Sequence, residues 1–418
     1  MENNELKNKK VHLKTYGCQM NTRDSEVIAG LLQKAGYKIT EDEAGADIII
    51  FNTCSVRQHA EEKVWSEIGR IAKVRRCKST LAGGVPNSKP IIGLVGCMAQ
   101  NYKEAAFERS ADVDFVVGPA DIAKIPEIIS QLSAVSFQLS AKGEKLKAKS
   151  IFERKIWETD GENRPEEIYH TGFFEDKNHA FIVISEGCSN FCSYCVVPYT
   201  RGALRHRRKE DVLKEINEAV ALGITSVTLL GQNVNSYQPS AISHQPSANF
   251  IDLIHEVNTI KGLKEFGFIT SHPKDTSVEL FKAMAECEKL KKCLHLPIQS
   301  GSDRILKLMN RNYTAKSYIA LAEDYRKIVK GGTITTDIIV GFPTEAEKDF
   351  QATFDLVEML KFDAAYIFKY SPRPHTEAAK WPDDVVKEEK ERRHRLILDL
   401  QKKISKALNS NDKIQNSK

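Results

Sequence analysis

Three closely spaced cysteines, Cys188, Cys192 and Cys195, constrain this chain more than any other feature. They lie in the segment Ser185 to Gly202, directly after an apolar run from Ala180 to Ile184 that reads as a buried strand. A loop this short can turn three thiolates onto one centre, and three thiolates on a four-iron cluster leave one iron without a protein ligand. We therefore expect a strand end that presents an iron–sulfur site with an open iron. A ferredoxin-like electron carrier, the alternative, needs neither an open iron nor a barrel.

Composition limits the compartment and the number of domains. At 418 residues the chain suits two or three domains, and its net charge of +5 is too small to indicate nucleic-acid binding by itself. The N-terminus has no apolar signal region, and no run of about 18 apolar residues occurs, so we expect a soluble cytosolic protein without a membrane segment. In a reducing compartment, nine cysteines favour metal binding over disulfides. Cys77, Cys287 and Cys293 fit no ligand pattern, and we interpret them as structural or incidental.

The first part of the chain, residues 1–137, alternates short apolar runs with amphipathic stretches. This order predicts a doubly wound parallel sheet whose ligands bind at the carboxyl ends of the strands. The expected strands are Val11–Tyr16, Ala46–Asn52, Ile91–Val95 and Asp114–Val117. The expected helices are Ser25–Ala35, Ala60–Val74 and Tyr102–Ser110.

A second set of cysteines, Cys18, Cys54 and Cys97, follows the ends of three of these strands. Because the strands are expected to be parallel, the three thiols should meet at one edge of the sheet. We interpret them as a three-thiolate iron–sulfur site. Zinc fits less well, because a structural zinc site usually takes four protein ligands. Three buried structural cysteines would leave their shared position at strand ends unexplained.

Downstream of a polar linker expected at 138–175, the strand and helix pattern resumes. Six strand–helix units over 176–384 predict a partial parallel (β/α)6 barrel, with its working residues at the C-terminal ends of the strands. The expected strands are Ala180–Ile184, Ser226–Leu230, Glu265–Ile269, Lys292–Leu296, Thr333–Val340 and Ala364–Tyr370. Residues 238–249 contain a near repeat and read as a disordered surface insertion. A charged helix starting at Val385 forms the C-terminal part, 385–418, with a fraying tail.

The spacing Cys-x3-Cys-x2-Cys resembles the cluster motif of radical SAM enzymes, and several other blocks resemble the MiaB-type tRNA methylthiotransferase family. These blocks are Lys14–Asn21 (KTYGCQMN), Asn52–Arg57 (NTCSVR), Gly96–Gln100 (GCMAQ), Leu230–Asn235 (LGQNVN) and His295–Ser302 (HLPIQSGS). The resemblance covers about residues 10 to 400. It implies addition of a methylthio group at C2 of N6-isopentenyladenosine at position 37 of tRNA.

Two [4Fe-4S] clusters and S-adenosylmethionine are implied as cofactors by the same resemblance. The catalytic cluster would be held by Cys188, Cys192 and Cys195, and its open iron would chelate S-adenosylmethionine, which an electron then cleaves to a 5′-deoxyadenosyl radical. A second cluster on the N-terminal cysteines would carry the sulfur that another S-adenosylmethionine methylates. Both clusters are expected to face one cavity. The implied partners are tRNA and a reductant protein, and the chain is expected to act as a monomer.

Candidate contacts to S-adenosylmethionine come from strand ends of the second domain, although such sequences also simply turn a chain. The candidates are Gly231, Gln232, Gln299, Ser300, Asp337 and Gly341. His272 is a candidate for substrate positioning or a plain hydrogen-bonding residue of its loop.

Cations just beyond the cluster motif give the best local signal for RNA, since they could hold phosphates near the active site. They are Arg201, Arg205, Arg207 and Arg208, and a solvated helix start is the alternative interpretation. MiaB-type chains usually continue into a β-rich TRAM domain, and no β-patterned residues follow the last helix here. Thr344 and His375 stand where Gly is common in the family.

Other substrates and another class of protein stay open at this point. The same chemistry acts on threonylcarbamoyladenosine in tRNA or on an aspartate of a ribosomal protein, but the Tyr16–Asn21 block favours isopentenyladenosine. The rival from a different class is an iron–sulfur scaffold or electron carrier with no substrate.

Overall fold

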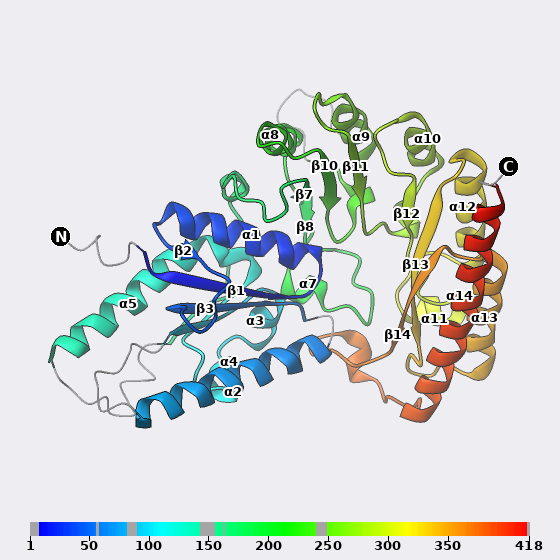
Figure 1. Ribbon diagram of the computed structural model, residues 1–418. Helices are drawn as coiled ribbons and strands as arrows, with labels where there is room; N and C mark the ends of the chain where they lie inside the picture. The colour runs from blue at the N-terminus through cyan, green and yellow to red at the C-terminus, as the bar shows by residue number, and fades with distance from the viewer. Residues whose placement is uncertain are drawn as a thin grey trace. The chain divides into compact units, whose positions relative to one another are not determined.

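The computed structural model describes residues 8–55, 58–81, 90–142, 155–161, 164–239 and 249–415. The chain divides into two compact units (Figure 1). The first comprises Met1–Asp176 together with the short segment Tyr199–Gly202, and the second comprises Lys177–Pro198 and Ala203–Lys418. None of the described helices is long and apolar enough to cross a membrane.

A six-stranded parallel sheet with the order β2-β1-β3-β4-β5-β6 forms the centre of the first unit. Its strands are β1 (Lys10–Tyr16), β2 (Lys38–Ile39), β3 (Ile48–Thr53), β4 (Ile91–Val95), β5 (Phe115–Val117) and β6 (Ile156–Glu158). All six residues of β3 are buried, as expected for a central strand with helices on both faces. The predicted doubly wound fold is confirmed, and its order reverses between β1 and β3.

Helices cover both faces of this sheet (Figure 1). One face carries α1 (Gln19–Lys34) and α5 (Ile125–Lys142), and the other carries α2 (Gln58–Leu81) and α3 (Cys97–Tyr102). The remaining short elements are α4 (Ala105–Arg109), the 3₁₀ turn Pro119–Lys124 and the 3₁₀ turn Glu166–Tyr169. Beneath α2 and α3, the core buries aliphatic and aromatic side chains that include Ile49, Phe51, Ile68 and Phe107.

Six parallel strands also build the second unit, arranged as the sheets β11-β10-β7 and β12-β13-β14. They are β7 (His179–Val183), β10 (Ser226–Leu230), β11 (Glu265–Phe268), β12 (Cys293–His295), β13 (Thr333–Val340) and β14 (Ala364–Lys369). A parallel bridge between Phe266 and Leu290 connects β11 to the segment before β12. The predicted partial barrel is confirmed. Two further short strands, β8 (Ser185–Glu186) and β9 (Arg205–His206), pair antiparallel.

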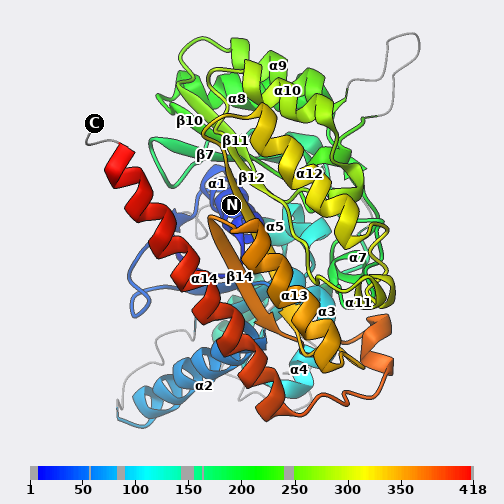
Figure 2. The same cartoon turned by 90° about the vertical axis from the view of Figure 1, so that its right-hand side faces the viewer.

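The outer layer of this unit consists of helices that follow the strands. They are α7 (Val197–Thr200, partly in the segment of the first unit), α8 (Lys209–Ala221), α9 (Phe250–Thr259), α10 (Val278–Glu286), α11 (Asp303–Leu308), α12 (Ala315–Ile328), α13 (Glu347–Leu360) and α14 (Lys387–Gln415). Figure 2 shows α14 lying along β14 and α13. Its buried side chains Lys390, Arg393, Ile397, Gln401 and Ile404 recur every three or four residues, which is the period of one helix face.

Several expected boundaries differ from the structure. Helix α1 begins six residues before the predicted Ser25, because Cys18 already caps it. The helix expected at Tyr102–Ser110 is two short helices, α3 and α4, separated at Lys103 with its positive φ of 50°. The range 138–175, interpreted as a linker, contains the end of α5 and strand β6, so its described part belongs to the first unit. Most of the expected insertion at 238–249 lies outside the described residues.

Candidate functional site

Three thiols meet at the carboxyl edge of the sheet in the first unit. Cys18 follows β1, Cys54 follows β3 and Cys97 follows β4. Since the strand order reverses between β1 and β3, the chain leaves these two strands in opposite directions and opens a crevice at their ends, where ligands of such sheets bind. The N-terminal cysteines were predicted to lie together, and the order of the parallel strands in the structure explains why they do.

Close backbone approach brings the first two of these thiols together. A Cβ on Gly17 would lie only 2.9 Å from Cys54 Cβ, so the residue next to Cys18 must be this small. A hydrogen bond with Cys54, the charge of Arg201 and backbone N–H groups together outweigh burial and lower the pKa of Cys18 to about 6. Its position as N-cap of α1 also favours a thiolate. Burial instead raises the pKa of Cys97. A cysteine binds metal as its thiolate, so the lowered pKa prepares Cys18 to bind.

Two buried asparagines tie the three cysteine loops to one another. Asn52 donates from Nδ2 to the carbonyl oxygen of Asn21 at 2.8 Å and to Ser25 Oγ at 2.9 Å, and its Oδ1 accepts from Asn21 Nδ2 at 3.0 Å. Gly96, with a positive φ of 87°, leaves room for this amide, because a Cβ there would lie 2.4 Å from Asn52 Oδ1. This network fixes the spacing of the loops independently of the thiols.

A buried ion-pair group lies beside these thiols. Asp24 is 1% exposed and accepts hydrogen bonds from Arg164 Nη1 and Arg201 Nη2, each at 2.7 Å. Burial raises the pKa of Asp24, but the two arginines outweigh burial and hold that pKa below its ordinary value. Arg201 also donates from Nε to Cys97 Sγ at 3.2 Å. Its burial and these contacts are incompatible with the predicted role of Arg201 in binding RNA phosphates.

In the second unit, the loop with Cys188, Cys192 and Cys195 follows β7 and β8. The amide of Cys195 donates to the carbonyl oxygen of Cys192 at 2.9 Å, which makes a tight turn between these two ligand candidates. Burial and the nearby charge of Cys192 raise the pKa of Cys195 to about 12, and burial raises that of Cys188. The loop is fixed from outside by Asn310, whose Nδ2 donates to the carbonyl oxygens of Asn190 and Phe191.

Arg311 supplies a cation to this second set of thiols. Its Nη1 donates to Cys192 Sγ at 3.4 Å, its Nη2 to the carbonyl oxygen of Pro297 at 3.1 Å and its Nε to Tyr313 Oη at 2.9 Å. The side chain is buried, with 7% of the residue exposed. A fixed positive charge here compensates part of the negative charge that three thiolates and an iron–sulfur cluster would bring. Sequence analysis did not identify Arg311, because no motif marks it.

Among the described side chains, no group of three or more His, Cys, Asp or Glu residues is arranged to hold a metal ion. A four-iron cluster makes a different demand, because each thiolate binds a different iron atom. Both sets of cysteines offer the three soft sulfur donors that such a cluster takes.

Polar atoms without partners gather at the strand ends beside the second cysteine set. The segments that follow β7, β10 and β11 each contribute at least one buried oxygen or nitrogen that has no hydrogen-bond partner among the described residues. These atoms are Ser185 Oγ, Gln232 Oε1, Asn233 Oδ1, Ser271 Oγ and His272 Nε2. Unpaired buried polar groups are costly, so they indicate a site that a polar ligand completes. The amino, carboxylate and ribose groups of S-adenosylmethionine would provide such partners.

Two of these strand-end residues, Ser185 and His272, have further constraints. Gly231 lies against Ser185, because a Cβ there would be 2.3 Å from Ser185 Oγ, which keeps the site narrow. Burial lowers the pKa of His272 to about 2, so its ring is neutral. The Nδ1 of this ring accepts from the amide of Lys274 at 3.2 Å, which leaves Nε2 to carry the proton toward the site.

The other predicted cofactor contacts have mainly structural partners. Gln299, with a φ of 70°, pairs through its backbone with β13, and Ser300 is fully buried beside Thr353. Asp337 is half-buried and lies 3.4 Å from His295 Nε2. Gly341, with a φ of 69°, begins the loop after β13.

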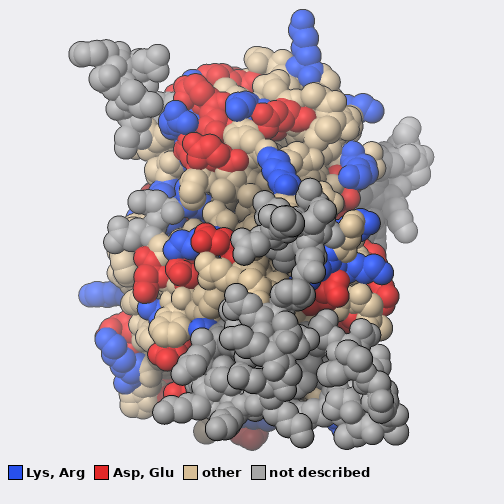
Figure 3. Space-filling view, turned by 90° about the vertical axis from the view of Figure 1, so that its left-hand side faces the viewer, with Lys and Arg blue, Asp and Glu red and all other residues tan. Residues whose placement is uncertain are grey.

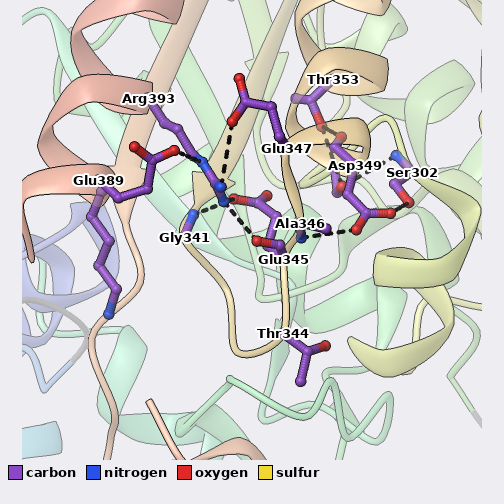
Figure 4. Close-up of polar contacts among 12 residues, drawn as sticks. Ser302, Gly341, Thr344, Glu345, Ala346, Glu347, Asp349, Thr353, Glu389 and Arg393 are labelled. Atoms are coloured by element: carbon purple, nitrogen blue, oxygen red, sulfur yellow. Dashed lines mark hydrogen bonds and ion pairs between the residues drawn. The ribbon is translucent and has the colours of Figure 1, made fainter. Parts of the chain in front are cut away.

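The loop after β13 is held by a buried ion pair that sequence analysis missed. Figure 4 shows Arg393 reaching from α14 to Glu345 in this loop. Arg393 Nη1 lies 2.8 Å from Glu345 Oε2, which also accepts the amide of Gly341 at 2.6 Å. Burial raises the pKa of Glu345, which these partners only partly offset. Glu389 accepts from Arg393 Nε at 2.6 Å. The C-terminal helix thus fixes a predicted cofactor loop.

The remaining candidates for RNA contact differ in exposure. Arg207 is 5% exposed and forms ion pairs with Asp211 and Glu215 on α8, so it is not available to phosphates. Arg208 is exposed and Arg205 is half-buried. On the face drawn in Figure 3, the described Lys and Arg side chains are interspersed with Asp and Glu and form no basic stripe.

Comparison with known proteins agrees with this division of the chain. Residues 10–118 match the family described as uncharacterized protein family UPF0004, and residues 182–357 match the radical SAM superfamily. The tRNA-2-methylthio-N(6)-dimethylallyladenosine synthase of Syntrophomonas wolfei is 43% identical over 396 residues, which cover 94% of this chain and 82% of that protein. The enzyme of the same name from Thermotoga petrophila is 40% identical over 401 residues, covering 95% and 83%.

Solved structures with low sequence identity share the fold. The radical S-adenosylmethionine methyltransferase TsrM from Kitasatospora setae aligns with a TM-score of 0.57 at 14% identity, covering 89% of this chain and 75% of that one. The cobalamin-dependent S-adenosylmethionine radical enzyme OxsB aligns with a TM-score of 0.55 at 14% identity, covering 96% and 56%. At such identities the likeness establishes the architecture alone.

Proposed function

Because this chain belongs to the family of tRNA-2-methylthio-N(6)-dimethylallyladenosine synthases, we propose that it attaches a methylthio group to C2 of N6-isopentenyladenosine at position 37 of tRNA. The observation that carries the proposal is the presence of two separate sets of three cysteines, one at the ends of three parallel strands and one in the loop after β7 and β8. In each set a buried arginine donates to one sulfur. An electron carrier would need only one set and no polar strand ends.

Each part of the proposed site has a defined task. Cys188, Cys192 and Cys195 would hold the cluster that binds S-adenosylmethionine, and Cys18, Cys54 and Cys97 would hold the second cluster. When bound, these groups supply an electron, a carbon radical that removes the C2 hydrogen, and a sulfur atom that has received a methyl group. The C2–H bond would thereby be exchanged for a C2–S bond, with the hydrogen leaving on 5′-deoxyadenosine, the sulfur released from the second cluster and one electron returned to that cluster.

The protein's own residues bind and orient the cofactor in this scheme. The unpartnered atoms of Gln232, Asn233 and Ser271 would receive the polar groups of S-adenosylmethionine. His272, neutral and with Nε2 unpartnered, would donate a hydrogen bond without adding a charge beside the sulfonium. Arg393 and Glu345 keep the loop of Gly341 in place.

The proposed partners are tRNA and a reductant protein that supplies the electrons. Arg205 and Arg208 are the arginines of the predicted RNA segment whose exposure allows contact with phosphates. The proposal places the protein in the cytoplasm, where its substrate is, and treats it as a monomer.

The test uses the anaerobically reconstituted, reduced protein with S-adenosylmethionine and a short anticodon stem-loop. One stem-loop carries isopentenyladenosine and a matched one carries threonylcarbamoyladenosine at the same position. We expect mass spectrometry to detect the 2-methylthio product, together with 5′-deoxyadenosine, only with the first. Product from the second stem-loop alone would reassign the substrate. If no 5′-deoxyadenosine formed with either stem-loop, radical chemistry would be excluded.

A further inference from the structure

Arg201 belongs to the peptide segment that carries Cys188, Cys192 and Cys195, but its side chain lies beside the other set of cysteines. It follows Cys195 by six residues in the sequence, yet the short segment Tyr199–Gly202 belongs to the first unit. The same peptide thus carries a predicted ligand of one cluster and, shortly afterward, a side chain placed among the predicted ligands of the other.

The guanidinium of Arg201 is fixed from two sides. Nε donates to Cys97 Sγ at 3.2 Å, and Nη2 donates to Asp24 Oδ2 at 2.7 Å. Asp24 is itself held by Arg164, whose Nε donates to the carbonyl oxygen of Pro119 at 3.0 Å. With 6% of Arg201 and 1% of Asp24 exposed, the orientation of the planar guanidinium is determined by its partners.

Burying an arginine is costly, and attraction to a carboxylate often fails to repay the desolvation of the two charges. Asp24 already has Arg164 as a partner, so the pair alone does not account for Arg201. Among the contacts described above, Arg201 makes one that Arg164 does not, the hydrogen bond to the sulfur of Cys97. This argues for a task at the sulfur in addition to the ion pair.

We propose that Arg201 is a positioning residue for the second cluster, which orients Cys97 as a ligand and tunes the reduction potential of that cluster through its N–H···S hydrogen bond. The inference rests on the proposed function, which assigns Cys97 to a cluster. Hydrogen bonds to ligand sulfur and nearby positive charge stabilise the more negative, reduced state of an iron–sulfur cluster. Arg201 therefore holds the potential of this cluster higher than three thiolates alone would.

The experiment isolates the second cluster in a variant with Cys188, Cys192 and Cys195 all replaced by Ala. Into this background we introduce Arg201→Gln, which removes the charge, and Arg201→Lys, which keeps the charge without the planar fork. Arg70→Gln is the control, because it removes the same charge from an exposed arginine of the same unit, where Arg70 pairs with Glu43 and Glu67. The measurements are iron and sulfide content, the midpoint potential by electron paramagnetic resonance at poised potentials, and the rate of iron loss to a chelator.

We expect R201Q to lower the midpoint potential and to speed iron loss, because removing such a partner of a metal ligand usually lowers metal affinity by about 10- to 100-fold. R201K should give a smaller shift, and R70Q should give none. A cluster present in R201Q with the potential of the background protein would overturn the inference. So would an equal shift in R70Q, because the effect would then be one of overall charge.

The two proposals fail in different ways. If the background protein itself binds no iron and sulfide, the two-cluster function is wrong before Arg201 is tested. Should R201Q fail to give the circular dichroism spectrum of the folded protein, R201K decides, since it keeps the charge beside Asp24. An R201K protein with an unshifted potential and unchanged iron loss would then refute a role for the hydrogen bond.

Discussion

Replacing Arg393 by Ala is expected to destabilise the second unit and loosen the loop after β13. Arg393 and Glu345 are 5% and 4% exposed, and the guanidinium donates to both the carboxylate and the carbonyl oxygen of Glu345 at 2.8 Å. Removing one partner of a buried pair costs about 3 to 5 kcal/mol, because it leaves the other charge buried without compensation. Since burial already raises the pKa of Glu345, this carboxyl can take up a proton instead, and we expect a loss near the lower limit of that range.

A loss of about 3 kcal/mol corresponds to a fall in the melting temperature of about 6 to 12 °C for a domain of this size. The assay is urea unfolding followed by circular dichroism, together with calorimetric binding of S-adenosylmethionine to the reconstituted protein. The pH dependence has a defined sign. Without Arg393, the folded-state pKa of Glu345 rises further above its unfolded value, so the destabilisation should grow as pH rises from about 5 to 8.

The neighbouring Arg392 provides the matched control. Its side chain is 44% exposed and also pairs with Glu389 and Glu347, so its replacement by Ala should cost less than about 1 kcal/mol. Equal destabilisation by the two substitutions, or a loss in the Arg393 variant that does not vary with pH, would refute the assignment of a buried ion pair that fixes this loop.

Three further predictions concern single positions. Gly301→Ala should lower stability by about 1 to 3 kcal/mol in urea unfolding, because its Cβ would lie 2.5 Å from a backbone oxygen of α13; an unchanged midpoint would contradict this packing. Gly69→Ala, in α2 with nothing within 4 Å of the new Cβ, should raise stability by about 1 kcal/mol in the same assay, and any loss would count against the assigned helix. Arg311→Gln should speed chelator removal of iron from the cluster on the second cysteine set by about 10- to 100-fold, as its hydrogen bond to Cys192 is lost; an unchanged rate would show that this contact does not support the cluster.

Sequence reasoning placed the strands well because each is a short apolar run closed by a polar or glycine residue. Strand β13 has the predicted bounds, Thr333–Val340, and Cys18, Cys54 and Cys97 follow the strands that were expected. Parallel strands end at the same edge of a sheet, so cysteines that follow them lie close together although they are far apart in the sequence. Strand β6 was missed because the lysine-rich stretch before it dominated the composition.

The arginines show where such reasoning fails. Arg201 and Asp24 are 177 residues apart, and no local pattern predicts that one neutralises the other. The basic run after the cluster motif therefore read as a set of RNA contacts, with a solvated helix start as the alternative. Arg207 had a usable signal, since Asp211 and Glu215 follow it at intervals of four, the spacing of partners along a helix. The contacts of Arg311 with Cys192 and of Arg393 with Glu345 are tertiary, so no local pattern predicts them.

The most direct test of a two-cluster methylthiotransferase is nucleoside analysis of tRNA from a strain that lacks its own enzyme. The strain expresses either this chain or the variant with Cys18, Cys54 and Cys97 replaced by Ala. We predict that the chain restores 2-methylthio-N6-isopentenyladenosine, whereas the variant leaves only the isopentenyl precursor. The 2-methylthio nucleoside in the variant, or its absence with both proteins, would contradict the account.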